Sequence, residues 1–274
     1  MQPTNRFLNS QDYRLLSFIA LRKEFESLYS DVFGKIPETY GSKYQNQSRI
    51  HWSRDWEYPW AVLSSHVLAG ERVLDCGCGG SPLLPFLAKH GCMAYGIDTY
   101  EHKRRSLLQY YRDLFKKAGK YSVQPKSGSR KKRGYSDYIS LFFKCLKGEN
   151  NLWYYRKDPN KMGFRIRFFR ESLTDMHFEN NFFDKVYCIS VIEHLKKDDA
   201  YRGMKEMARV LRPRGLLTMT LDNDGPHVNP DLVGKYMDLI RASGLRLHGK
   251  SDFTLPEKEN LPGKYNVLGI VLEK

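Results

Sequence analysis

Residues 73–98 constrain the fold of this chain more than any other segment. A short apolar strand leads into Asp75 and then into a glycine-rich turn. A helix is expected directly after the turn, because Pro82 suits a first helical position and the leucines that follow share one helical face. A second strand at 93–97 ends at an acid, Asp98. This order of strand, glycine turn, helix, strand and acid predicts an α/β unit that holds the adenosine part of a cofactor.

The residues of the turn indicate which cofactor is held. A dinucleotide fingerprint needs a third glycine where this chain has Pro82. Asp75, just before Gly77 and Gly79, would repel a pyrophosphate but suits a cationic ligand such as the ammonium group of S-adenosylmethionine (SAM). Asp98 can accept hydrogen bonds from both ribose hydroxyls, and the glycines let the backbone approach the ligand. We therefore expect SAM binding here, with a glycine turn that holds no ligand as the alternative.

Two segments of the chain carry a family resemblance. The glycine turn resembles the D-x-G-x-G motif of class I SAM-dependent methyltransferases, and residues 171–222 resemble the type-11, ubiquinone-biosynthesis-like branch of that superfamily. The resemblance covers residues 67–222 apart from 101–163. It implies a Rossmann-like seven-stranded α/β sheet with helices on both faces. The elements that carry it in the second segment are an acid-containing turn, an FD-x-V strand and an EHL helix start, at 174–178, 183–189 and 193–195.

The same resemblance implies the contacts to the cofactor. When residues 176–178 are aligned on the family's L-P-F, Ser172 falls where an aspartate usually contacts adenine, so Asp175 is expected to replace it. Arg54, ahead of the first strand, is a further candidate, because its guanidinium can pair with the SAM carboxylate. The other implied cofactor-binding residues are Asp75, Gly77, Cys78, Gly79, Asp98, Thr99, Leu173 and Ser190.

Charge is distributed unevenly along the chain. We expect residues 1–66 to form an N-terminal helical cap and 67–274 a SAM-binding methyltransferase domain, with a basic, aromatic insertion at about 101–163. The net charge is +14, and residues 101–170 hold twenty of the 45 Lys and Arg residues but five of the 31 Asp and Glu residues. Basic residues interleaved with aromatics can bind nucleic acid or another anion. The favoured, simpler interpretation is a solvated loop at 120–134 beside an inserted helix packed on the core.

The N-terminal segment offers candidates for contact with the acceptor. Segments before the first strand often lie over the cofactor, so Tyr44, His51 and Tyr58 are candidates to meet the substrate. The tryptophans of this segment recur every fourth residue, which favours one apolar helix face packed on the core. These tryptophans are Trp52, Trp56 and Trp60.

The last third of the chain is expected to complete the sheet. An acid at 198–199 is expected to cap a helix, which Pro213 and Gly215 would end. The remaining expected elements are a strand at 216–221, a helix at about 230–243, a strand near 245 and an antiparallel strand at 267–272.

The candidate catalytic residues follow from the chemistry of methyl transfer. The protein must align the acceptor with the methyl group and, for a hydroxyl or ammonium acceptor, take one proton. His194 is the first candidate for the base, and Glu193 beside it is the second. Both are expected at the carboxyl ends of strands, where open α/β sheets bind ligands. Asp222, Asp224 and His227 follow the next strand, and a purely structural hydrogen bond is the alternative role for His194.

Together these features predict a SAM-dependent methyltransferase that acts on an oxygen or nitrogen of a small or anionic acceptor, such as a glycan, lipid or metabolite. The alternatives are an RNA methyltransferase that uses the basic insertion and a non-catalytic SAM-binding or scaffold protein. No apolar run reaches membrane-spanning length, and the five cysteines, an odd number, favour free thiols in the cytoplasm. No metal site is expected, because the Cys76 and Cys78 pair lies inside the glycine turn.

Overall fold

The computed structural model describes residues 4–33, 53–99, 163–223, 232–254 and 266–274. Several expectations fall on the remaining residues and lie outside this description: the loop at 120–134, most of the expected insertion, and Tyr44, His51, Trp52, Asp224 and His227.

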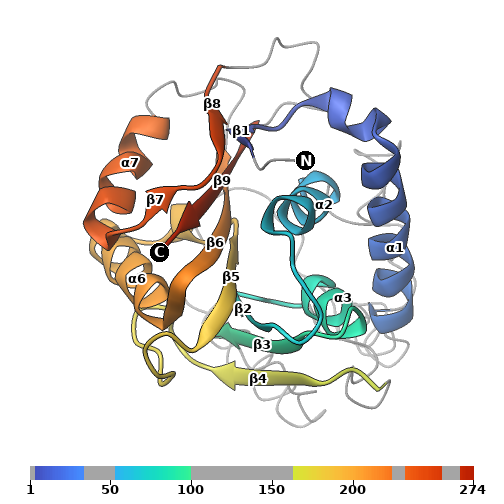
Figure 1. Ribbon diagram of the computed structural model, residues 1–274, viewed down its shortest axis with the longest axis horizontal. Coiled ribbons are helices and arrows are strands. Elements are labelled where there is room, and N and C mark those ends of the chain that lie inside the picture. The colour runs from blue at the N-terminus through green and yellow to red at the C-terminus, as the bar shows by residue number, and fades with distance from the viewer. Residues whose placement is uncertain (1–3, 34–52, 100–162, 224–231, 255–265) are drawn as a thin grey trace, which may run out of the picture.

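The strands form one sheet in the order β4-β3-β2-β5-β6-β9-β1-β8, with β7 paired to β9 (Figure 1). The neighbouring strands β4, β3, β2, β5 and β6 run parallel to one another, and β9 runs antiparallel to β6. The chain proceeds from β2 outward to β3 and β4, and then returns to β5 on the other side of β2. Ligands bind at such a reversal, beyond the carboxyl ends of the strands. The strands are β1 Thr4–Phe7, β2 Arg72–Cys76, β3 Met93–Asp98, β4 Ile166–Arg170, β5 Phe183–Ile189, β6 Leu211–Asn223, β7 Arg246–Leu247, β8 Lys250–Asp252 and β9 Asn266–Glu273.

Helices cover both faces of the sheet, as expected. α1, α2 and α3 lie on one face, and α6 and α7 lie on the other (Figure 1). Two short 3-10 helices, η1 and η4, precede α1 and α6. The bounds are η1 Ser10–Arg14, α1 Leu16–Phe33, α2 Arg54–Ser65, α3 Leu83–Lys89, η4 Ile192–His194, α6 Lys197–Val210 and α7 Leu232–Ser243.

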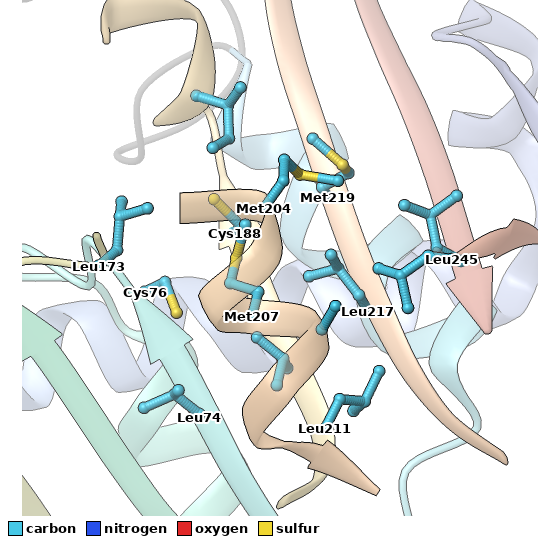
Figure 2. Packing of buried hydrophobic residues seen from close by; sticks show 14 of the residues in the cluster. Leu74, Cys76, Leu173, Cys188, Met204, Met207, Leu211, Leu217, Met219 and Leu245 are labelled. Atoms are coloured by element: carbon cyan, nitrogen blue, oxygen red, sulfur yellow. The ribbon is translucent and has the colours of Figure 1, made fainter. Parts of the chain in front are cut away.

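Each face of the sheet has its own hydrophobic core. On the α6 face, Met204 and Met207 lie beside Leu217 and Met219 of β6 (Figure 2). On the opposite face, the indoles of Trp56 and Trp60 stack 5.3 Å apart and are fully buried or nearly so. The expected apolar tryptophan face is therefore present for these two residues.

The sheet has nine strands where seven were expected, and part of the difference comes from the N-terminal segment. β1 pairs with β9 and with β8, so residues 1–66 contribute a strand to the sheet as well as helices. Asn5 holds β1 in place, because its buried side chain donates to the carbonyl of His248 at 3.0 Å and accepts from the amide of Val271 at 2.7 Å. Besides its helices, the N-terminal segment therefore contributes one strand that was not expected.

The junction between α6 and β6 also differs from the expectation. The helix ends at Val210, before Pro213 and Gly215, and β6 already begins at Leu211. The pairing with β5 then skips several residues of β6, and Arg214 within the skipped stretch has φ of 61°. Pro213 and Gly215 therefore lie in an irregularity inside the strand. At the other end of α6 the N-cap residue is Lys196. Asp198 and Asp199 lie in the first turn of the helix, where their negative charges interact favourably with the positive end of the helix dipole.

Candidate functional site

The glycine turn follows β2 at the carboxyl edge of the parallel strands. The amides of Gly77 and Cys78 both donate to the carbonyl of Ile97 in β3, at 2.9 and 3.1 Å. Gly77 has φ of 70° and Gly79 has φ of 47°, a backbone region that favours glycine. The Cys78 thiol is buried beside Gly96, and burial raises its pKa well above the ordinary value. The backbone, rather than the cysteine side chain, therefore forms the outer surface of the turn.

Asp98 is attached to the tip of this turn. The amide of Gly79 donates to Oδ2 of Asp98 at 2.9 Å. Because Asp98 is the last residue of β3, this hydrogen bond ties the turn to the end of the neighbouring strand. A Cβ at Gly79 would meet no atom within 4 Å. The outer side of the turn is therefore open to a ligand, with a carboxylate at its edge.

Asp75 lies beneath the turn with a side chain that is almost fully buried. Burial and the neighbouring carboxylate of Asp98 raise its pKa to about 8, while the Arg54 guanidinium acts in the opposite direction. A buried carboxyl of this kind is stabilised in its charged form by a cation placed beside it. The position suits a ligand that carries an ammonium group.

A second polar group, the Glu57 cluster, lies at the carboxyl ends of β5 and β6. It consists of Arg54 and Glu57 of α2, Ser190 after β5, and Thr220 and Asp222 of β6. Oε1 of Glu57 accepts from the hydroxyls of Ser190 at 2.5 Å and Thr220 at 2.6 Å, while Oε2 pairs with Arg54. Burial alone would raise the pKa of Glu57, but Arg54 and the two hydroxyls lower it below the usual value. Glu57 is therefore a buried carboxylate with a partner for each oxygen.

Arg54 supplies the positive charge of the Glu57 cluster. Its Nη1 donates to Oγ of Ser190 at 2.7 Å as well as to Glu57, and it lies 4.0 Å from Oδ2 of Asp222. Its side chain is 22% exposed. Burial alone would lower the pKa of Arg54, but Glu57, Tyr58 and Asp222 raise it above its usual range. The guanidinium is thus a fixed positive charge at the edge of the site.

Ser190 holds the end of β5 in an unusual backbone conformation. Its φ is 49°, its amide donates to the carbonyl of Thr220 at 3.0 Å, and its hydroxyl lies 2.9 Å from Oδ1 of Asp222. The hydroxyl has one proton and faces carboxylates of both Glu57 and Asp222, so it donates to one of them at a time. From the end of β5, the Ser190 side chain therefore contacts residues of both α2 and β6.

The two candidate bases occupy different environments. Oε1 of Glu193 accepts from the amide of Asp222 at 2.8 Å, and its Oε2 is buried with no hydrogen-bond partner among the described residues. Burial raises the pKa of Glu193 to about 8, helped by the charges of Asp222 and Glu57 and opposed by backbone hydrogen bonds. His194, one residue on in η4, has an exposed side chain. Of the two candidates, Glu193 is therefore the one with a buried polar atom, Oε2, that has no hydrogen-bond partner among the described residues.

The residues expected near adenine lie at the β3 and β4 end of the site. Leu173 is buried against α6, where a Cβ at Gly203 would stand 2.0 Å from its Cδ1. Asp175 is exposed in a tight turn, and its amide donates to the carbonyl of Ser172 at 3.2 Å. Thr99 is exposed, and its carbonyl accepts from Arg170 at 3.2 Å. Asp175 and Thr99 are thus accessible, whereas Leu173 is held in the core.

The sequence interpretation missed two members of the Glu57 cluster. Glu57 and Thr220 were not candidates, although Arg54 and Glu57 stand three residues apart in a helix rich in aromatics. That spacing is a weak signal, because such pairs usually lie on the surface. Tyr58, a candidate for substrate contact, is instead buried against Phe25 and hydrogen-bonded to Ser81.

Comparison with known proteins gives one family-model match and several solved structures. Residues 149–219 match the family model described as a methyltransferase domain. No curated protein shows a sequence match to this chain. A solved 1,6-didemethyltoxoflavin-N1-methyltransferase from Burkholderia thailandensis is 15% identical, with a TM-score of 0.48 over 97% of this chain and 90% of that one. A magnesium protoporphyrin IX methyltransferase from Synechocystis PCC 6803 is also 15% identical, with a TM-score of 0.43 over 95% and 98%.

The matched segment includes strands β4 and β5 of the Rossmann-like sheet. The chain thus combines a segment that matches a methyltransferase domain with a mixed α/β sheet that has helices on both faces. S-adenosylmethionine is the cofactor expected from the sequence. The glycine turn, the open side of Gly79 and the acids Asp75 and Asp98 fit that cofactor in shape and charge.

Two kinds of feature are absent from the described ranges. No helix there is long and apolar enough to cross a membrane. The same residues contain no group of three or more His, Cys, Asp or Glu side chains arranged to hold a metal ion.

Proposed function

We propose that this protein is a class I methyltransferase that uses S-adenosylmethionine, and that it moves a methyl group from SAM to an oxygen or nitrogen of a small or anionic acceptor, such as a glycan, lipid or metabolite. The observation that carries the proposal is the open glycine turn with Asp98 bound to its tip. That arrangement offers backbone and carboxylate to an adenosine ligand, next to a polar cluster at the adjacent strand ends. Within this proposal, SAM supplies the methyl group on a positively charged sulfur.

The proposed roles of the cofactor-binding residues follow their positions. Asp98 accepts from the ribose hydroxyls, and Gly77, Cys78 and Gly79 present backbone to the ligand. Asp75 faces the ammonium group, and Arg54 faces the carboxylate of the methionine end. Thr99, Leu173, Asp175 and Ser190 complete the proposed set.

The proposed base is one of two adjacent residues. The buried and unpartnered Oε2 of Glu193 supports a role in accepting a proton from the acceptor. The exposure of His194 supports an alternative in which the imidazole meets an acceptor that enters from solvent. Substitution of each residue separates the two, as described in the Discussion.

The acceptor class can be tested directly. SAM labelled in its methyl group is incubated with pools of glycans, lipids, metabolites and RNA, and the labelled product is identified. The expected product is a small molecule. Replacing Arg130, Lys131, Lys132 and Arg133 by Ser should then leave activity on that acceptor nearly unchanged. Labelled RNA, lost in the fourfold variant, would instead favour an RNA methyltransferase, and intact SAM binding with no labelled product would favour a scaffold.

A further inference from the structure

Helix α2 carries two buried carboxylates that face opposite ways. Asp55 pairs with Arg22 of α1 at 2.5 Å, on the side away from the strand ends. Glu57 pairs with Arg54 and reaches the hydroxyls of Ser190 and Thr220 on the strand side. The two acids share a helix and similar burial, but only Glu57 is connected to the proposed cofactor site.

The two oxygens of Glu57 are used for different purposes. Oε1 accepts hydrogen bonds from the hydroxyls of Ser190, just after β5, and Thr220, in β6. These hydrogen bonds anchor the carboxylate to the sheet. Oε2 pairs with Arg54, so the guanidinium is fixed relative to the same strands. Every hydrogen bond of Arg54 to another described residue uses Nη1. Among the described residues the donors on Nε and Nη2 have no hydrogen-bond partner, so they can serve an anion.

The geometry points to Glu57 as a positioning residue that holds Arg54 for the carboxylate end of the cofactor. This inference rests on the proposed role of Arg54 in the site. A long arginine side chain loses conformational freedom when it binds, and a guanidinium already fixed by Glu57 loses less of it. Glu57 touches no ligand itself in this arrangement and acts through Arg54.

The variant Glu57→Gln is expected to keep the hydrogen bonds from Ser190 and Thr220 and to remove the ion pair with Arg54. The carbonyl oxygen of Gln can still accept from Ser190 and Thr220, which leaves its NH₂ group facing Arg54. Donor then faces donor, and the guanidinium is displaced while the anchor to the sheet is retained. Asp55→Asn is the matched control, because it weakens a buried ion pair of the same helix on the opposite side.

The experiment compares two ligands by calorimetry: S-adenosylhomocysteine, which has the carboxylate, and 5′-methylthioadenosine, which lacks the whole amino-acid end. Glu57→Gln should weaken S-adenosylhomocysteine about 10- to 100-fold, the size of a lost charge-assisted contact, and methylthioadenosine less than about 2-fold. Asp55→Asn should lower thermal stability and leave the ratio of the two affinities at the wild-type value. A merely structural role of Glu57 would weaken both ligands together.

Two results would overturn the inference. An unchanged affinity ratio in folded Glu57→Gln would show that Arg54 does not depend on Glu57. A wild-type protein that binds neither ligand would overturn the proposed cofactor site itself and the inference with it. If the Gln variant does not fold, Glu57→Asp takes its place, because it keeps the charge and withdraws the carboxylate from Arg54. The same selective loss of S-adenosylhomocysteine affinity is expected. An unchanged ratio of the two affinities counts against the inference.

Discussion

Gly77 and Val191 lie so close together that a Cβ on the glycine would stand 2.6 Å from Cγ2 of the valine. This contact joins the glycine turn after β2 to the loop that follows β5. The proposed cofactor site and the proposed base in η4 are therefore connected through van der Waals contact as well as through the sheet.

Replacing Gly77 by Ala should impair cofactor binding. The new methyl group would push Val191 and the turn apart, and its φ of 70° adds a strain of about 1–2 kcal/mol. We expect the Kd for S-adenosylhomocysteine to rise about tenfold or more. Gly70→Ala is the control, because Gly70 has φ of 85° with no atom within 4 Å of a Cβ. Calorimetry that gave equal affinities for the two variants would contradict the role of the contact.

Asp98→Ala should weaken S-adenosylhomocysteine binding by about 1–3 kcal/mol, because hydrogen bonds to a charged acceptor are lost. Asp98→Asn retains an acceptor for the amide of Gly79 without the charge, so an intermediate loss is expected. Titration calorimetry on both variants checks the order. Wild-type affinity in the alanine variant would remove Asp98 from the site.

Cofactor binding should release protons near pH 7. In the ligand-free protein the pKa of Asp75 is raised to about 8, so this carboxyl is mostly protonated at pH 7. An ammonium group beside it would lower that pKa and ionise it. The affinity for S-adenosylhomocysteine should therefore increase as the pH rises from 6 towards 8.

The proton release can be measured by calorimetry at pH 7 in two buffers with different ionisation enthalpies. Up to one proton per bound ligand is expected for the wild type, and none for Asp75→Asn. Equal binding heats in the two buffers for the wild type would show that Asp75 does not change its charge on binding.

The base can be identified from the pH dependence of kcat. If Glu193 takes the proton, kcat should rise with pH through about 8, because the carboxylate form accumulates there. Glu193→Gln should lower kcat about 10²–10⁴-fold with SAM affinity nearly unchanged. His194→Asn serves as the comparison. If kcat falls in that variant while Glu193→Gln remains active, His194 is the base that takes the proton.

The β2–α3–β3 unit was predictable from sequence because its signals are local. Asp75, the glycines and Asp98 stand within 24 positions, and they indicate one turn and two strand ends. Glu57 was not predictable, because its partners come from β5 and β6, and a glutamate between aromatics has no local mark of burial. The irregularity at Pro213 was missed for a related reason: proline and glycine indicate a break, but the pairing of β6 with β5 decides which element contains it.

Strand β1 has a consequence for the order in which the fold is completed. Asn5 accepts from the amide of Val271, 266 positions away along the chain, and β1 lies between β9 and β8. Loop-closure entropy makes such distant pairing slow, and N-terminal segments leave the ribosome first. Strand β1 is therefore synthesised long before β8 and β9 and has to wait for them before it can be paired on its two sides. Until β8 and β9 arrive, its unpaired backbone presents an open edge of the kind that favours aggregation.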